Sequence, residues 1–267
     1  MRHLPYALAL ASMLVSTAAL AQAPRSLEMR ALTSPEIKAA IAAGYTRVLV
    51  PSGGIEQNGP HMVLDKHDHI VRFAALKIAG AVGDMLVAPV LSIVPEGEFS
   101  PPTGNLRFAG TIGISEPAYE AVLDGVARSL KGAGFKDILF IGDHGQSQGA
   151  QARIAAKLSR AWWSEGVRVH QIDAYYDDAA QMRFLAMKGE TSASIGDHAG
   201  LIDTSELLAI APEGVRLETL TSLPRPLDAL GASGAPEQAN AELGKALIDL
   251  RIKAAIARIT SLLGKRE

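Results

Sequence analysis

Apolar and polar positions along the chain follow two alternating patterns. Short apolar runs bounded by Gly, Pro or charged residues predict buried strands, and segments with helical spacing predict amphipathic helices that cover them. The predicted strands are residues 47–51, 85–94, 137–143 and 167–176, and the predicted helices are residues 32–44, 115–132, 146–163 and 240–263. This alternation predicts an α/β fold: a single-domain, three-layer α/β/α arrangement with a mostly parallel central sheet.

Local signals refine several of these segments. In the first predicted helix, Ser34 can cap the free amides, Pro35 suits the first helical position and Gly44 can close the end. Stretches rich in Pro and Gly at residues 94–111 and 222–238 predict connections. We expect the first of these to lie as a loop over a pocket.

The first 21 residues have the pattern of a secretory signal peptide. A basic start precedes an apolar run over residues 4–20, and small residues suit cleavage before Gln22. The alternative is an N-terminal membrane anchor, but the run is shorter than the ~20 apolar residues that a spanning helix needs. We therefore expect a periplasmic or secreted protein, with residues 22–267 as one mature domain and no membrane contact after cleavage.

Composition narrows the chemistry. The chain has no cysteine, which excludes disulfides and thiolate ligands, so any metal must bind to His and carboxylate side chains. The formal net charge is −2, and Lys and Arg are dispersed along the chain. This gives no electrostatic footprint for nucleic acid.

Three histidine-bearing motifs follow or flank predicted strands. They read SGGIEQNGPHMVLDKHDH from Ser52, FIGDHGQSQGAQ from Phe140 and GDHAGLIDTSELL from Gly196, and they hold five of the six histidines that remain after cleavage. In the third motif, Thr204 or Ser205 could cap a short helix. Ligands of parallel α/β sheets bind beyond the carboxyl ends of the strands, so we expect the motifs to converge on one crevice.

These motifs resemble the creatininase (creatinine amidohydrolase) family. The segment PSGGIEQNGPHMVLDKH matches its first signature, and AGTI (residues 109–112), GDHGQS (142–147) and HAGLIDT (198–204) follow in the family's order. The resemblance runs from Leu32 to about Val215. It implies a metal-dependent hydrolase that cleaves a C–N bond of a small-molecule amide or cyclic amide through a metal-activated water, and it implies a homo-oligomer.

The family pattern also implies a ligand set. One metal would be held by Glu56, His67 and His144. The second metal of the family would fall on Asn58, Gln146 and a bridging His67, but amides are poor ligands for transition metals and a neutral imidazole cannot bridge two cations. We therefore predict one divalent metal ion, Zn²⁺ first, with Fe²⁺ and Mn²⁺ as alternatives.

Further motif residues would lie around this metal without binding it. His61 and Asp143 are expected to orient the ligands, and Asn58 and Gln146 to face the site or the substrate. Asp68 belongs to the same group, although a register shifted by one would make it the ligand in place of its neighbour.

Two residues carry the expected proton chemistry. His198 and Asp203 occupy the positions of the family's catalytic His and Glu. The resemblance implies that Asp203 moves a proton from water to the leaving nitrogen while His198 steadies the oxyanion. The alternative is a non-catalytic metal- or ligand-binding protein that retains the creatininase fold.

Overall fold

A four-stranded parallel sheet forms the centre of the computed structural model, which describes residues 23–264, so the predicted signal peptide lies outside the described residues. All pairings are parallel, in the order β2-β1-β3-β4. The strands are β1 (Arg47–Ser52), β2 (Met85–Val87), β3 (Asp137–Gly142) and β4 (Arg168–Gln171). The predicted α/β fold with a parallel sheet is confirmed.

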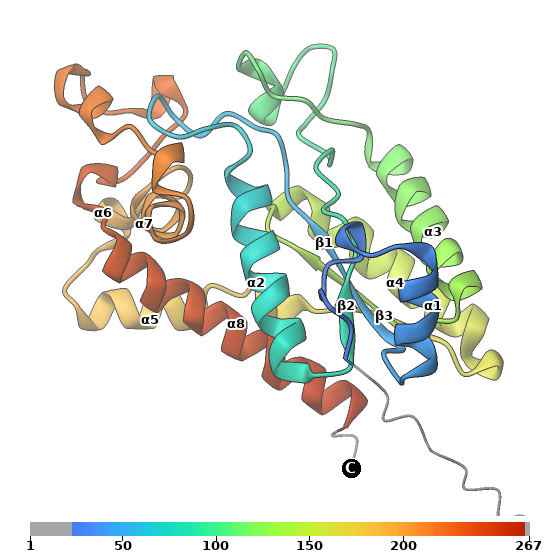
Figure 1. Cartoon of the computed structure of the whole chain (residues 1–267). Coiled ribbons are helices and arrows are strands. Elements are labelled where there is room, and N and C mark those ends of the chain that lie inside the picture. Colours follow the sequence, from blue (N-terminus) through green and yellow to red (C-terminus); the bar gives the residue numbers. More distant parts are fainter. Residues whose placement is uncertain (1–22, 265–267) are drawn as a thin grey trace, which may run out of the picture.

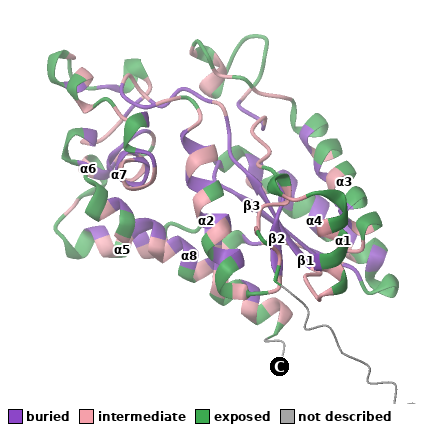
Figure 2. Ribbon diagram, viewed as in Figure 1, coloured by how far each residue is buried: buried purple, intermediate pink, exposed green. Residues whose placement is uncertain are grey.

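Helices cover both faces of this sheet (Figure 1). They are α1 (Ser34–Ala42), α2 (Lys66–Val82), α3 (Glu116–Ala133), α4 (Gln148–Trp162), α5 (Ala179–Met187), α6 (Ser192–Ile195), α7 (Leu201–Ile210) and α8 (Ala241–Leu263). Because strand side chains alternate between faces, Val48 and Val50 pack with α1, α3 and α4, whereas Leu49 packs with α2 and α8. The predicted three layers are therefore present, with the buried residues concentrated at the sheet (Figure 2).

Two strands are shorter than predicted. The run at 85–94 is a strand only to Val87, because Pro89 has no amide hydrogen to extend the ladder. The run at 167–176 leaves the sheet after Gln171, yet its apolar residues Ile172 and Tyr175 are fully buried. An apolar run thus marks burial more reliably than it marks a strand.

Two predicted helix starts were wrong. Thr33, not Ser34, precedes α1, and its amide donates to the Glu36 carboxylate at 2.6 Å, which closes a capping box. Helix α7 begins at Leu201 after Gly200, so Thr204 and Ser205 are buried inside the helix and do not cap it.

The register of the sheet determines where the loops that carry the motifs lie. Ser52 at the end of β1 pairs with Gly142 at the end of β3, so the loops that carry Glu56 and His144 leave the same edge side by side. Helix α2, which the apolar pattern did not predict, brings Lys66 and His67 to that edge in its first turn. No helix among residues 23–264 has the length and apolar character needed to cross a membrane.

Candidate metal centre

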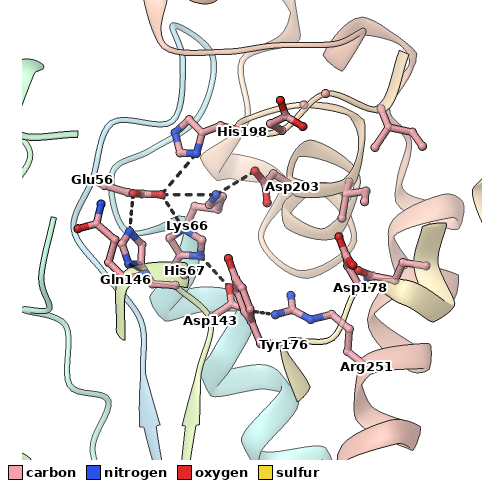
Figure 3. A pocket seen from close by; sticks show the side chains of 18 of the residues that line it. Glu56, Lys66, His67, Asp143, Gln146, Tyr176, Asp178, His198, Asp203 and Arg251 are labelled. Carbon is pink, nitrogen blue, oxygen red and sulfur yellow. Dashed lines mark hydrogen bonds and ion pairs between the residues drawn. The ribbon is translucent and has the colours of Figure 1, made fainter. Parts of the chain in front are cut away.

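Glu56, His67 and His144 meet at the carboxyl edge of the sheet. Figure 3 shows Glu56 and His67 facing each other there. All three are buried, and each offers a ligand atom within 4.8 Å of the others. Glu56 Oε1 lies 2.6 Å from His67 Nε2, and Glu56 Oε2 lies 2.9 Å from His144 Nε2. Two imidazoles and a carboxylate that converge in this way form a donor set that fits one divalent cation.

The charge on Glu56 is stabilised by its neighbours. Burial acts to raise the pKa of Glu56, but the charge of His67, hydrogen bonds from His144 and His67, and the ammonium of Lys66 outweigh burial. They leave the pKa well below its ordinary value. The carboxylate is therefore ionised and available as a ligand at neutral pH.

His67 is oriented by a second carboxylate. Its Nδ1 donates to Asp143 Oδ2 at 2.8 Å, so a cation that displaced the Nε2 proton shared with Glu56 would meet a nitrogen lone pair aimed at the cluster. Asp143 accepts in turn from Tyr175 Oη at 3.0 Å and pairs with the Arg251 guanidinium. The structure thus places Asp143 where a ligand-orienting group is expected.

Two carboxylates contact the same ring nitrogen of His144. Its Nε2 lies 2.9 Å from Glu56 Oε2 and 3.0 Å from Glu96 Oε2. Burial acts to lower the pKa of His144, but these two partners raise it to about 9. A cation bound at Nε2 would move the ring proton to Nδ1. Nδ1 could then no longer accept from the backbone amide of Gln146, and this 3.3 Å contact would have to open.

A lysine outside the predicted set of site residues lies against the cluster. Lys66 is fully buried, and its Nζ lies 3.2 Å from Asp203 Oδ2 and 3.8 Å from Glu56 Oε1. Asp203 Oδ2 also accepts from the Ala199 amide at 2.8 Å. Burial acts to raise the pKa of Asp203, but the Lys66 ammonium is the main cause that lowers it to about 2, so this carboxylate holds a proton poorly.

His198 presents one defined nitrogen to the cavity. Its Nε2 lies 2.9 Å from the Gln57 carbonyl, which can only accept, so Nε2 carries the proton. Nδ1 then bears the lone pair when the ring is neutral, and it lies 3.9 Å from Glu56 Oε1. Because burial and Lys66 lower the pKa of His198, the neutral ring is favoured, and this geometry suits a proton acceptor better than the expected oxyanion donor.

Three expected site residues are not brought to the cluster. Asn58 braces its own loop, with Nδ2 donating to the carbonyls of Glu56 and Val63 at 3.0 Å each. His61 Nε2 lies 2.9 Å from Thr204 Oγ1, so it fixes the loop against α7 and orients no ligand. Asp68 accepts from the Gly54 amide at 3.2 Å and from Ser92 Oγ, so His67 and not Asp68 faces Glu56.

Four residues at the site were not predicted from the sequence: Lys66, Glu96, Asn105 and Arg251. Lys66 precedes His67 directly, but its burial depends on the unpredicted helix α2. Glu96 and Asn105 come from the Pro- and Gly-rich connection, which does lie beside the site as expected. Arg251 reaches Asp143 from α8, 108 residues away in sequence, and no local pattern could have indicated that contact.

A cavity of 540 Å³ opens above the cluster and is lined by Glu56, His67, His144, Gln146, His198 and Asp203, among others. Its outer part is acidic, because Asp177, Asp178 and Asp197 line it and are exposed. None of these three forms an ion pair within residues 23–264. Its two buried cations, Lys66 and Arg251, are already paired with carboxylates.

Comparisons with known proteins give matches over most of the chain. A family model described as creatininase, creatinine amidohydrolase, matches residues 30–259. The chain is 30% identical over 180 residues to the mycofactocin precursor peptide peptidase of Mycobacterium tuberculosis (strain CDC 1551 / Oshkosh), and the match covers 64% of this chain and 61% of that protein. It therefore spans less than two thirds of that relative's length.

Creatinine amidohydrolase of Pseudomonas putida is 24% identical over 205 residues, with 75% of this chain and 78% of that protein covered. Two solved structures share the fold. One, described as creatininase Mn, has a TM-score of 0.73 and 22% identity, and covers 90% of this chain and 100% of that chain. A mutant creatininase of Zn-Zn type has a TM-score of 0.71 and 22% identity, with 90% and 99% covered.

Proposed function

The chain belongs to the creatininase family, and from that premise we propose that it is a metal-dependent hydrolase of a C–N bond in an amide or cyclic amide. The observation that carries the proposal is the convergence of Glu56, His67 and His144 at the base of a cavity. The curated relatives are named for an amidohydrolase and a peptidase, both of which cleave amide bonds.

A bound metal and the side chains around it would have different roles in the reaction. A bound divalent cation would polarise an amide carbonyl and lower the pKa of water towards ~7. The geometry suits His198 Nδ1 to accept a proton from the attacking water and return it to the leaving nitrogen. The Lys66 ammonium, held by Asp203, supplies a fixed positive charge beside the carbonyl oxygen as negative charge develops on it.

The metal complement in this proposal is one divalent ion per chain. Asn58 turns its amide nitrogen to backbone carbonyls, and Gln146 offers only a neutral amide to the cavity. We favour Zn²⁺ because two imidazoles, a carboxylate and an open position suit its chemistry, with Mn²⁺ and Fe²⁺ as alternatives.

The cavity supports a substrate class. Its 540 Å³ suits a small amide or a short peptide end. The unpaired aspartates at its outer part would attract a substrate that carries a positive charge away from the scissile bond. We therefore place a cationic amide ahead of neutral or anionic ones.

Export and assembly are further parts of the proposal. The pattern of residues 1–21 supports a periplasmic or secreted enzyme, and N-terminal sequencing of exported protein should then begin at or near Gln22. Retention of the leader would contradict export. Family membership supports a homo-oligomer, which a strict monomer in light scattering at micromolar concentration would contradict.

The decisive experiment compares the protein with and without metal. Purified protein would be stripped with a chelator, reloaded with Zn²⁺ or Mn²⁺, and assayed against small amides, cyclic amides and dipeptides that carry cationic, neutral or anionic groups. We expect about one metal per chain and hydrolysis that returns only with metal, and Glu56→Gln should lose both. Tight metal binding without hydrolysis of any of these substrates would favour the non-catalytic alternative.

A further inference from the structure

Glu96 is a fully buried carboxylate on the loop that joins β2 to α3. The backbone is built closely around it: a Cβ on Gly113 would lie 2.8 Å from Glu96 Cβ, and a Cβ on Gly54 would lie 3.0 Å from Glu96 Oε1. Gly113 thus leaves room for the stem of Glu96, where a larger residue would collide with it, and the backbone at Gly54 lies close to the carboxylate tip.

One oxygen of Glu96 points at the candidate metal centre. Oε2 lies 3.0 Å from His144 Nε2, the same nitrogen that lies 2.9 Å from Glu56 Oε2. Asn105 Nδ2 holds the two carboxylates together, since it donates to Glu96 Oε2 at 3.2 Å and also contacts Glu56 Oε2. Two carboxylates and an imidazole nitrogen therefore converge where a single proton, or a cation in its place, would be shared.

The other oxygen of Glu96 has no hydrogen-bond partner, although it is buried. Within residues 23–264 the ion-pair partner of Glu96 is His144, and no Lys or Arg nitrogen lies within ion-pair distance of it. A buried carboxylate without a full set of partners is costly to ionise. A divalent cation at the cluster would supply the missing positive charge.

We propose that Glu96 is a direct ligand of the divalent cation held by Glu56, His67 and His144. The inference rests on the proposed function and deepens it, because the site becomes a set of two histidines and two carboxylates. That set balances the charge of a divalent ion. It also provides, from a different loop, a carboxylate that Gln146 cannot provide.

The test compares Glu96→Gln with Glu98→Gln, an exposed glutamate two residues further along the same loop. Affinity for Zn²⁺ would be measured by competition with a chromophoric chelator, and the ligand field by the absorption spectrum of Co²⁺-loaded protein. We expect Glu96→Gln to weaken binding by at least about 10- to 100-fold, the loss that even an outer partner of a metal site causes. Its Co²⁺ spectrum should change, and Glu98→Gln should match the wild type.

A second variant separates ligation from charge. Glu96→Asp keeps the charge and shortens the reach by one methylene, so a direct ligand predicts a weakening close to that of Glu96→Gln. Wild-type affinity in Glu96→Asp, or unchanged affinity and spectrum in Glu96→Gln, would overturn the inference and leave the proposed function intact. A wild-type protein that takes up no metal would overturn both.

Discussion

His67 Nδ1 donates to Asp143 Oδ2 at 2.8 Å, on the side of the ring opposite the nitrogen that faces Glu56. This contact fixes the direction of the ring, because a proton held on Nδ1 makes Nε2 the nitrogen that would bind a metal once its proton is displaced. The Arg251 guanidinium then holds the carboxylate in place. Contacts that run from Arg251 on α8 through Asp143 therefore orient His67 as a metal ligand.

Asp143→Asn should weaken the contact that orients the His67 ring. The amide cannot stabilise the imidazole as a carboxylate does, so we expect metal affinity to fall about 10- to 100-fold. Chelator competition measures the affinity, and circular dichroism checks that the fold persists. Asp68→Asn serves as the control because Asp68 contacts Gly54 and Ser92 outside the cluster. Equal losses in the two variants would show that the effect is not specific to the His67 contact.

His144 and His198 should behave differently when each is replaced by alanine. His144 is one of the three clustered donors, so His144→Ala should lose metal and activity together. His198 lies outside that cluster, so His198→Ala should keep its metal while kcat falls by about 10²-fold or more, as for a lost acid or base.

Elemental analysis of the two dialysed variants distinguishes these outcomes. If both retain full metal, the cluster is not the metal site. If both lose it, His198 is itself a ligand, and another group must carry the proton.

The fold could be predicted because three of the four strands are buried along their whole length. All six residues of β1 and all six of β3 are buried, and such runs stand out against the amphipathic helices between them. Helix α2 was missed because it begins within the first motif, where buried Lys66 and His67 interrupt the apolar pattern. Polar residues that are buried for function look like surface residues in a hydrophobicity pattern.

Part of the site was predictable for a different reason. Glu56, His67 and His144 lie in motifs that keep their order along the chain, and the structure brings all three together. Glu96 and Arg251 carry no such local mark, since their contacts depend on how a loop and the last helix pack. The oxyanion role expected of His198 depended on its tautomer, which is set by the Gln57 carbonyl and cannot be read from sequence.

Stability should depend on pH through His61. Burial lowers the pKa of His61 to about 4, with Thr204 as its partner. Between pH 6.5 and pH 4 the unfolded chain therefore binds more protons at this position than the folded chain, and stability falls as pH falls. We expect the contribution of His61 to the unfolding free energy to drop by about 2 kcal/mol from pH 7 to pH 5.

Urea denaturation at the two pH values measures this loss. His61→Gln cannot gain a proton, so its stability should change less between pH 7 and pH 5 than that of the wild type. His69→Gln is the control, because His69 lies partly exposed on α2, with 39% of its side chain accessible. A wild type and a His61→Gln variant with the same pH dependence would contradict the assignment.

The acidic outer part of the cavity should select substrates by charge. Asp178→Asn should raise KM for a cationic amide roughly twofold to fivefold, the effect of one partly solvated charge, with kcat unchanged. KM for a neutral amide should not move, and added salt should reduce the difference. Asp228→Asn, an exposed position that does not line the cavity, provides the control. An equal rise in KM for both substrates would indicate a loss of shape and not of charge.

Replacement of Lys66 should lower the stability of the metal-free protein and raise its affinity for metal. Its ammonium compensates Glu56 and Asp203 in a fully buried place, so Lys66→Met should destabilise the metal-free protein by roughly 3–5 kcal/mol. The same change removes a positive charge that repels a cation at Glu56, so metal affinity should rise by at least about tenfold. Added metal should then restore much of the lost stability, because it supplies the charge that Lys66 supplied.

Activity of the metal-reloaded Lys66→Met variant should stay low, since the cation that faces the developing oxyanion is gone. Denaturation with and without Zn²⁺, together with chelator competition, measures the effects on stability and affinity, and Lys77→Met on the exposed side of the same helix is the matched control. If Lys66→Met weakens metal binding instead, Lys66 positions Glu56 for the metal and does not compete with it.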